Sequence, residues 1–306
     1  MQIRNFLFHR VSDQTDMLWP PMRVALFEKI IKHLSKKYTV IHLEHFMLQN
    51  EKRKTKKPLA SISFDDGYKD NIENAAPALK KNNCPASFYV VTDCIDNNTP
   101  TWTYQLDYAI ANSKINAIVL DKDLSKLPHG RFDISNKERK MQFAIALKPH
   151  LKKLDHKHRN EILKNVLEQL HAVEMPRIMM NWTDSNELMQ AGFEIGSHGK
   201  THAMLGTSLE HDELNDELVQ SAKAIEIHTG RFPVTISYPV GSYNHQTIAA
   251  AKQAGYKIGL AVKQRFYETE HDSIFEIPRV ELYNESWVKT QLRMNGLLEK
   301  IKSLKR

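Results

Sequence analysis

Two groups of polar residues have the types and spacing that metal-assisted hydrolysis requires. Asp65 and Asp66 stand side by side before Gly67, and His198 and His202 lie four positions apart. Adjacent carboxylates repel each other, so both stay ionised only beside a cation or strong hydrogen-bond donors. Asp66 and the two histidines together offer one carboxylate and two imidazoles, a set that leaves open positions for water and substrate on a metal ion. A divalent ion held in this way lowers the pKa of water and polarises a carbonyl group.

Each group has a simpler explanation when it is taken alone. Asp-Gly is a common turn dipeptide, and a chain with 15 histidines contains some pairs at this spacing by chance. The combination is more specific, because both groups follow predicted strands. A third polar segment, residues 237–244, also follows a predicted strand. Its Pro239 and Gly241 predict a turn whose backbone N–H groups could face a ligand, or else an ordinary loop between a strand and a helix.

Predicted strands and helices alternate along most of the chain. The strands are predicted at residues 6–8, 38–41, 59–64, 86–91, 193–196, 234–238, 257–261 and 274–282. Helices are predicted between most of them, and two capping-box patterns, at residues 184–187 and 207–210, predict helix starts. About eight strands in this pattern predict an α/β fold, a distorted (β/α)7-8 barrel. In such barrels the carboxyl ends of the strands face the active site, so the three polar segments would meet at one mouth.

Residues 96–181 interrupt this alternation. The segment is charged and irregular, and residues 148–171 are its clearest amphipathic helical part. We interpret it as a mostly helical insertion carried on the barrel, so that residues 1–306 form a single domain.

Composition restricts the class of protein and its partners. The chain has 306 residues, 41% hydrophobic and 26% charged, as is ordinary for a globular protein, and its net charge is +7. Much of the excess lies in residues 51–57 and 300–306, which could contact phosphates or the inner membrane face, or could be a solvated loop and a frayed terminus. No nucleic-acid motif accompanies them, so no nucleic-acid partner is predicted. Cys84 and Cys94 match neither a disulfide framework nor a zinc motif.

The location of the protein is predicted from segments that the sequence does not contain. The first ten residues have no apolar stretch of signal-peptide length. No window approaches the roughly 18 apolar residues that a membrane-spanning helix needs. We therefore expect a cytoplasmic protein.

The segments that carry these polar residues resemble the polysaccharide deacetylase family, carbohydrate esterase family 4. Residues 63–67, SFDDG, are similar to the family's first motif, T/S-F-D-D-G. Residues 198–202, HGKTH, are similar to its second motif, H-S/T/G-x-x-H, and residues 238–241, YPVG, stand where the third is expected. The resemblance covers about residues 59–91 and 184–282, with a weaker patch at the N-terminus.

The resemblance implies a metal site and a base. Asp66, His198 and His202 would bind one divalent ion, for which zinc is the first choice and iron, cobalt and nickel also suit the ligands. Asp65 would be the general base that activates the attacking water.

The third motif implies contacts to the substrate and to the oxyanion, made by Tyr238, Pro239 and Val240. The backbone N–H of Val240 would hold the oxyanion, which a change of side chain does not prevent. The family usually has an arginine that orients the base where Ser237 stands here. Arg279, on the last predicted strand, could take over that role at the site, or could form a salt bridge at the rim.

The fifth motif of the family supplies a histidine general acid near the C-terminus, and no histidine follows Trp287 here. Residues 6–11, FLFHRV, look like that motif instead. Some relatives that act on poly-N-acetylglucosamine are circularly permuted, with this strand first in the chain. In a closed barrel the first and last strands are neighbours, so we expect His9 to be the general acid, the alternative being a histidine packed in the N-terminal strand.

Taken together, the residues and the resemblance predict a metal-dependent hydrolase that removes the N-acetyl or a related acyl group from an amino sugar. The expected substrate is an intracellular polysaccharide or glycoconjugate intermediate, nucleotide-linked or lipid-linked. Aromatic residues that could stack on a sugar are Tyr68, Trp102, Trp182, Tyr238 and Tyr243.

Two alternatives stay open. One is a metal-dependent amidase that acts on a non-sugar amide or imide. The other is a non-catalytic barrel that binds a saccharide or a partner, which Ser237 and the missing C-terminal histidine favour. The sequence contains no G-x-S-x-G elbow, G-x-G-x-x-G loop or P-loop, which argues against a serine hydrolase or a nucleotide enzyme.

Overall fold

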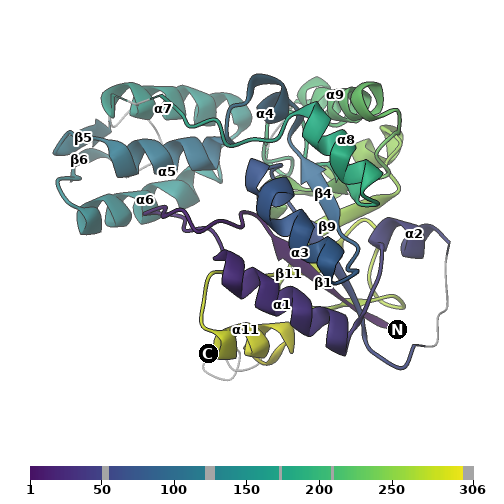
Figure 1. Cartoon of the computed structure of the whole chain (residues 1–306). Helices are drawn as coiled ribbons and strands as arrows, with labels where there is room; N and C mark the ends of the chain where they lie inside the picture. The colour runs from purple at the N-terminus through teal and green to yellow at the C-terminus, as the bar shows by residue number, and fades with distance from the viewer. Residues whose placement is uncertain (50–54, 121–127, 172–173, 208–209, 299–306) are drawn as a thin grey trace.

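A ring of parallel strands forms the centre of the computed structural model, which describes residues 1–49, 55–120, 128–171, 174–207 and 210–298 (Figure 1). Around the ring the strands are β1 (Gln2–Phe8), β11 (Ile277–Glu281), β9 (Ile258–Val262), β8 (Thr235–Ser237), β7 (Glu194–Ser197), β4 (Ser87–Val90) and β3 (Leu59–Phe64). β3 pairs again with β1, with Phe8 beside Phe64, and this pairing closes the ring. All seven pairings are parallel, so the predicted barrel is confirmed, with seven strands.

Because the ring is closed, the first and last barrel strands of the chain are neighbours. β1 lies between β3 and β11, with Phe6 beside Val280. His9 follows β1 directly and therefore lies at the same mouth of the barrel as the residues that follow β3.

Two short strands of the same sheet lie outside the ring. β2 (Thr39–Val40), which corresponds to the strand predicted at residues 38–41, pairs only with β3. β10 (Tyr267–Glu268) runs antiparallel to β1. The prediction of about eight barrel strands therefore included β2, which is only two residues long and pairs on one side, with β3.

Helices surround the barrel and bury their apolar faces against it. Outside the insertion they are α1 (Val24–Lys37), α2 (Leu43–Leu48), α3 (Ala76–Lys81), which continues a π-helical turn at Asn71–Ala75, α4 (Thr92–Asn97), α8 (Trp182–Gln190), α9 (His211–Thr229), α10 (His245–Gln253) and α11 (Trp287–Met294). In α1 the residues Phe27, Ile30, Ile31 and Leu34 recur at helical spacing and are all buried. The Phe27 ring packs edge-on against Phe8 of β1 at 5.2 Å between ring centroids.

Both predicted helix starts are wrong in detail. The capping box of α8 joins Asn181 to Asp184, each side chain accepting a bond from the other's backbone N–H, so Asp184 is the far partner of the box and not its first residue. The box of α9 joins Glu210 to Glu213 in the same way, where residues 207–210 were expected. Residues 208 and 209 lie outside the described residues.

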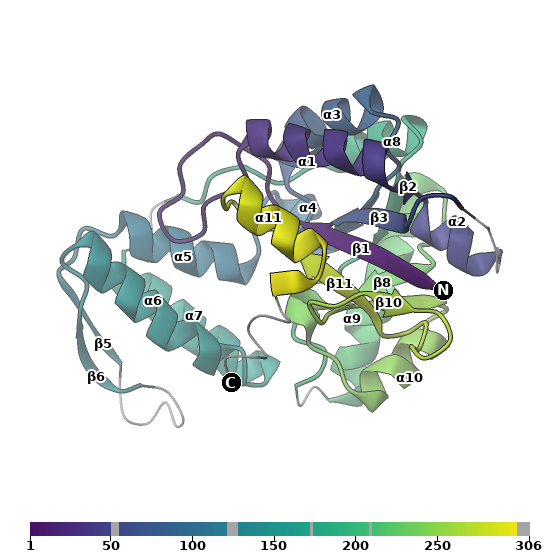
Figure 2. The ribbon, with the colours of Figure 1, turned by 90° about the horizontal axis from the view of Figure 1, so that it is seen from below.

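The predicted insertion contains a group of elements that lies to one side of the barrel (Figures 1 and 2). Its elements are α5 (Trp102–Asn112), β5 (Ala117–Leu120), β6 (Gly130–Asp133), α6 (Lys137–Leu151) and α7 (His156–Gln169). β5 and β6 form an antiparallel hairpin, which the expectation of a mostly helical segment missed. We call these elements the insertion lobe.

The insertion lobe has a hydrophobic core of its own. Residues such as Leu106, Ile118, Leu147 and Val166 are buried together there, and Met204 of the barrel packs against them. The lobe therefore rests on the barrel near the second histidine, although the single-domain organisation of residues 1–306 stays a prediction. In the described ranges, none of the helices is long and apolar enough to cross a membrane. Of the two basic runs, only residues 55–57 belong to the described part.

Candidate active site

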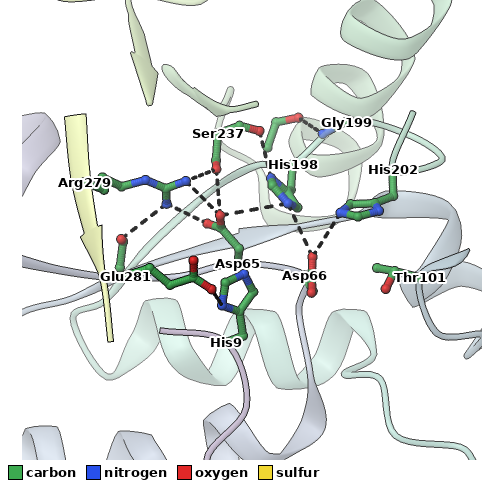
Figure 3. Close-up of polar contacts among 12 residues, drawn as sticks. His9, Asp65, Asp66, Thr101, His198, Gly199, His202, Ser237, Arg279 and Glu281 are labelled. Atoms are coloured by element: carbon green, nitrogen blue, oxygen red, sulfur yellow. Dashed lines mark hydrogen bonds and ion pairs between the residues drawn. The ribbon is translucent and has the colours of Figure 1, made fainter. Parts of the chain in front are cut away.

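The carboxyl ends of the barrel strands gather the predicted polar residues at one mouth (Figure 3). Asp65 and Asp66 follow β3, His198 follows β7, and His9 follows β1. Arg279 reaches the same place from the middle of β11. Four of the strands in the ring thus each contribute a charged or ligating side chain, as the barrel geometry requires.

Asp66, His198 and His202 converge on one point. Their ligating atoms lie within 4.8 Å of one another, and this is the only such group of three that the described residues contain. The Nε2 atoms of His198 and of His202 are both 3.3 Å from Oδ1 of Asp66. All three side chains are buried.

The protonation pattern of the triad fits a bound cation. Nδ1 of His198 donates to the carbonyl oxygen of Ser237 at 2.8 Å, so Nε2 of the neutral ring carries a lone pair. That lone pair faces Oδ1 of Asp66, a buried atom with no hydrogen-bond partner among the described residues. Burial alone would raise the pKa of Asp66, but His198 and His202, when protonated, hold it well below its ordinary value, and the positive charge of an ion bound between them would act in the same direction. An ionised oxygen and two imidazole nitrogens around one point are the donors that zinc, iron, cobalt and nickel accept.

The backbone around the site is held in an unusual conformation. Asp66, His202 and Val240 have φ angles of 75°, 62° and 56°, in the left-handed region that residues with a Cβ atom rarely adopt. For a β-branched valine this conformation is a true outlier and costs on the order of 1–3 kcal/mol. Because the surrounding fold fixes all three angles at one mouth, the strain is a mark of a functional site.

Asp65 is bound by a buried arginine. Nη1 of Arg279 donates to Oδ1 of Asp65 and Nη2 donates to Oδ2, both at 2.8 Å. The Ser237 hydroxyl donates to Oδ2 of Asp65 at 3.0 Å and accepts from Nη2 of Arg279 at 2.8 Å. Burial would raise the pKa of Asp65, but the Arg279 guanidinium, together with His198 and His9, outweighs it and the pKa is lowered. Asp65 is therefore held ionised and in one orientation.

A second acid contacts His9. Nδ1 of His9 lies 3.6 Å from Oε1 of Glu281, and the hydroxyl of Tyr283 donates to Oε2 of the same carboxylate at 2.6 Å. The His9 ring packs edge-on against Trp19. His9 thus points into the mouth with one nitrogen facing a carboxylate, and neither Glu281 nor Trp19 carried a signal in the sequence.

The loop that carries both histidines is tied to α9 by a buried carboxylate. Glu217 accepts hydrogen bonds from the backbone N–H of Lys200 at 2.9 Å and of Thr201 at 3.1 Å, and from the Thr201 hydroxyl. On the other side of the site, the indole N–H of Trp102 donates to the carbonyl oxygen of His202 at 3.2 Å. These contacts fix the loop from two directions.

A cavity of about 270 Å³ lies at the mouth of the barrel and is lined by the triad, Asp65 and His9. Its lining from the barrel is Leu7, His9, Trp19, Asp65, Asp66, His198, His202, Val240, Val262 and Glu281, and its lining from the insertion lobe is Thr103, Tyr104, Asp107, Lys148 and Lys152.

Two residues of the predicted third motif do not reach the cavity. Tyr238 is fully buried, and its hydroxyl donates to the carbonyl oxygen of Phe275. Pro239 is buried as well. Arg279 is likewise absent from the lining, and its guanidinium contacts Asp65 and not open space. Of the residues expected to meet the substrate or oxyanion, only Val240 lines the cavity.

The predicted stacking aromatics also lie elsewhere. Trp182 stacks on His228 outside the site, and the Tyr243 hydroxyl binds Glu276. None of the five predicted aromatics is part of the cavity lining, whereas Trp19 and Tyr104 are. Spacing along the chain gave no signal for these two, because the fold brings them in from a loop and from the insertion lobe.

Comparison with known proteins defines the class. Residues 52–259 match the profile of the family described as polysaccharide deacetylase, and this is more than half of the chain. The chain belongs to the polysaccharide deacetylase family, which supports a deacetylase activity.

Individual relatives are distant. The Bacillus subtilis protein YxkH, named as a polysaccharide deacetylase, is 21% identical over 257 residues, which are 84% of this chain and 63% of YxkH. The Streptococcus pyogenes deacetylase PplD, solved in complex with acetate, superposes with a TM-score of 0.63 and 15% identity, covering 96% of this chain and 98% of PplD. A de-N-acetylase from Aggregatibacter actinomycetemcomitans superposes with a TM-score of 0.61 and 18% identity, covering 96% of this chain and all of that one (100%). At these identities the solved structures establish a shared fold.

Proposed function

We propose that this chain is a metal-dependent deacetylase that removes the N-acetyl or a related acyl group from an amino sugar. The observation that carries the proposal is the pairing of two unlike buried aspartates at one cavity. Asp66 has an oxygen facing two imidazole nitrogens, and its neighbour Asp65 is held ionised by Arg279. Metal-assisted amide hydrolysis needs both a metal-binding carboxylate and a base at the same point.

Asp66, His198 and His202 would hold the divalent ion, with zinc as the first choice and iron, cobalt or nickel as alternatives. When bound, such an ion supplies a Lewis acid that makes water more acidic and the acyl carbonyl more electrophilic. The hydrogen bond from Nδ1 of His198 to the Ser237 carbonyl sets the ring so that Nε2 is the ligating atom.

Asp65 is the base in this proposal. Its lowered pKa keeps the carboxylate ionised at neutral pH, so it can accept a proton from the attacking water. Arg279 and Ser237 use part of its hydrogen-bonding capacity and leave other lone pairs of the two oxygens for that proton. Arg279 thus takes the role that an arginine at position 237 would have in the family pattern.

His9 is the general acid that protonates the departing amine. It lines the same cavity, and Glu281 faces its Nδ1, which leaves Nε2 for the leaving group. The backbone N–H of Val240 donates to the developing oxyanion, and the strained left-handed turn at this residue supports that role. A circularly permuted relationship to other deacetylases would explain why this histidine precedes the rest of the site in the chain.

The cavity of about 270 Å³ has room for a sugar residue, and we propose that the substrate is an intermediate of polysaccharide or glycoconjugate assembly. We propose a nucleotide-linked or lipid-linked amino sugar, handled in the cytoplasm. A protein that deacetylated only long polymers would contradict this part of the proposal and leave the reaction type intact.

Acetate release from a panel of N-acetylated sugars tests the reaction. We expect release by the metal-loaded wild type, loss on chelation with recovery on adding zinc, and a loss of at least 10³-fold in kcat in Asp65→Asn. A parallel assay for ammonia and formate release from non-sugar amides and imides separates the amidase alternative. Metal content measured on the same samples identifies a protein that binds an ion but performs no hydrolysis.

A further inference from the structure

The insertion lobe contributes two lysines to the cavity that contains the triad. Lys148 lies in the last turn of α6 and Lys152 caps its C-terminal end, and both line the cavity opposite the barrel residues. Residues four positions apart on a helix lie on the same face, so the two ammonium groups are neighbours. The deacetylation chemistry proposed above uses neither of them.

The two lysines differ in how their charge is compensated. Nζ of Lys148 lies 2.8 Å from Oδ2 of Asp107, a buried carboxylate of α5. Lys152 is half-buried, and within the described ranges its ammonium group makes neither a hydrogen bond nor an ion pair. Burial and the neighbouring charge of Lys148 lower the pKa of Lys152.

The acids that face Lys152 are already engaged. Asp107 and Glu281 are the two carboxylates that act on it electrostatically. Asp107 binds Lys148, and Glu281 accepts from Tyr283 and faces His9. A half-buried cation without its own counter-ion costs free energy that an anionic ligand would return.

We propose that Lys152, supported by Lys148, forms an anion subsite in this cavity, which selects amino-sugar substrates that carry a phosphate or a carboxylate. This inference rests on the proposed deacetylase function, and it names a substrate class that the reaction itself does not require. The acyl group would lie at the triad while the charged group contacts the insertion lobe. A sugar phosphate and an acidic glycan share this chemistry, and a neutral homopolymer lacks it.

The test compares one sugar in three forms. Metal-loaded wild type is assayed for acetate release from the methyl glycoside of N-acetylglucosamine, from N-acetylglucosamine 1-phosphate, and from a disaccharide of N-acetylglucosamine and a uronic acid. We expect at least a tenfold higher kcat/KM for a charged form, falling as salt is added. The phosphate and uronate arms show which anion the subsite takes.

Lys152→Met keeps the unbranched stem and removes the charge, and Lys153→Met, at the exposed next residue, is the matched control. We expect Lys152→Met to lower the ratio of charged to neutral kcat/KM about tenfold or more, with the ratio unchanged in the control. Lys148→Met is a poorer test, because it would leave the buried Asp107 without its cation. An equal ratio in wild type and Lys152→Met overturns the subsite and leaves the deacetylase proposal standing.

A binding measurement separates the two proposals when turnover fails. The affinity of N-acetylglucosamine 1-phosphate for metal-loaded wild type and for Lys152→Met is measured by calorimetry. Direct coordination of phosphate to the metal would persist in the variant, so only the difference between the two proteins counts. Weaker binding by the variant without acetate release supports the subsite and contradicts the deacetylase, whereas equal binding contradicts the subsite.

Discussion

The two ends of the barrel each bury a pair of carboxylates, and they treat the pairs in opposite ways. At the mouth, Asp65 and Asp66 follow β3. At the opposite end of the barrel, where the strands begin and which we call the closed end, Glu194 is the first residue of β7 and faces Glu44 of α2. Both pairs are nearly inaccessible to solvent, and burial alone would raise the pKa of Asp65, Asp66 and Glu44.

The compensation differs between the ends. Asp65 has Arg279 at 2.8 Å, and the pKa values of Asp65 and Asp66 are both lowered. At the closed end, the nearest cation to Glu44 is Arg231, exposed and 3.7 Å away. There burial, followed by repulsion from Glu194, raises the pKa of Glu44 to about 8.

This difference shows which groups the fold places at the mouth to keep its acids ionised. A buried arginine, a serine and two imidazoles are needed to keep two adjacent acids ionised in a dry site. At the opposite end Ser87 donates to Glu194 at 2.6 Å and Nδ1 of His42 lies 3.6 Å from it. Glu44, however, has no buried cation beside it among the described residues, and it holds a proton at neutral pH. Ionised buried acids are therefore the feature that marks the mouth as the reactive end.

Removing Arg279 should abolish this difference and have the largest effect. In Arg279→Met the buried Asp65 loses its cation, so its pKa rises and the base becomes protonated. We expect kcat for acetate release to fall at least 10²-fold and the free energy of unfolding to fall by about 3–5 kcal/mol. Kinetics and urea unfolding measure the two effects.

The matched control is the surface pair Arg265 and Asp272, which is also bidentate, at 2.8 and 2.6 Å. Arg265→Met should cost about 0–1 kcal/mol and leave kcat unchanged. In Arg279→Lys the charge stays but the two parallel bonds cannot form, so an intermediate kcat is expected. If Arg279→Met and Arg265→Met lost equal amounts of kcat and of unfolding free energy, Arg279 would have no special role in keeping Asp65 ionised.

A smaller loss is expected at the third buried acid of the mouth. Glu217 accepts from the backbone N–H groups of Lys200 and Thr201 and so positions the loop between the two histidines. Glu217→Gln keeps the size but turns an amide N–H₂ group toward backbone donors. We expect the affinity for zinc to fall about tenfold or more, as for other groups that orient metal ligands.

Competition with a chromogenic chelator measures that affinity, and Asp216→Asn is the neighbouring control. Asp216 is exposed and binds the Lys200 side chain, so its variant should keep the zinc affinity of the wild type. Unfolding of the metal-free proteins shows whether Glu217 acts through general stability alone. Unchanged zinc affinity in Glu217→Gln would remove the positioning role.

The sequence predicted the parts of the site that depend on local spacing. Asp65, Asp66 and the two histidines follow strands directly, so the barrel had to bring them to one mouth. The position of His9 also followed, because closure makes β1 and β11 neighbours. These inferences needed only strand order and the rule that active sites lie at the carboxyl ends.

The rest depended on packing that no spacing encodes. Glu281 reaches the site from the end of a strand and Glu217 from the face of a helix. Acidic residues are common at such positions, so neither of them indicates a functional role in the sequence. Lys152 and Tyr104 line the cavity from the insertion lobe, whose hydrophobic core packs against Met204 and Val240 of the barrel. Tyr238, predicted as a substrate contact, lies away from the cavity for the same reason: its ring packs in the core between the barrel and the helices α9 and α10, beside Gly259.

The smallest expected effect is on stability, at Glu44, and it tests directly whether the acids at the two ends of the barrel differ in ionisation. Between the ordinary pKa of 4.5 and the folded value of about 8, folded Glu44 keeps a proton that the unfolded chain has released. Stability should therefore fall as pH rises through this window and level off above pH 8. Glu44→Gln carries a permanently neutral group, so at pH 8 it should be more stable than wild type by about 1–3 kcal/mol, and at pH 5 nearly equal to it.

Urea unfolding of both proteins from pH 5 to 9 measures the difference, and Asp70, whose pKa is raised to about 6, contributes equally to both. Parallel curves across this range would mean that Glu44 is ionised in the folded protein, and that the two ends of the barrel do not differ as described.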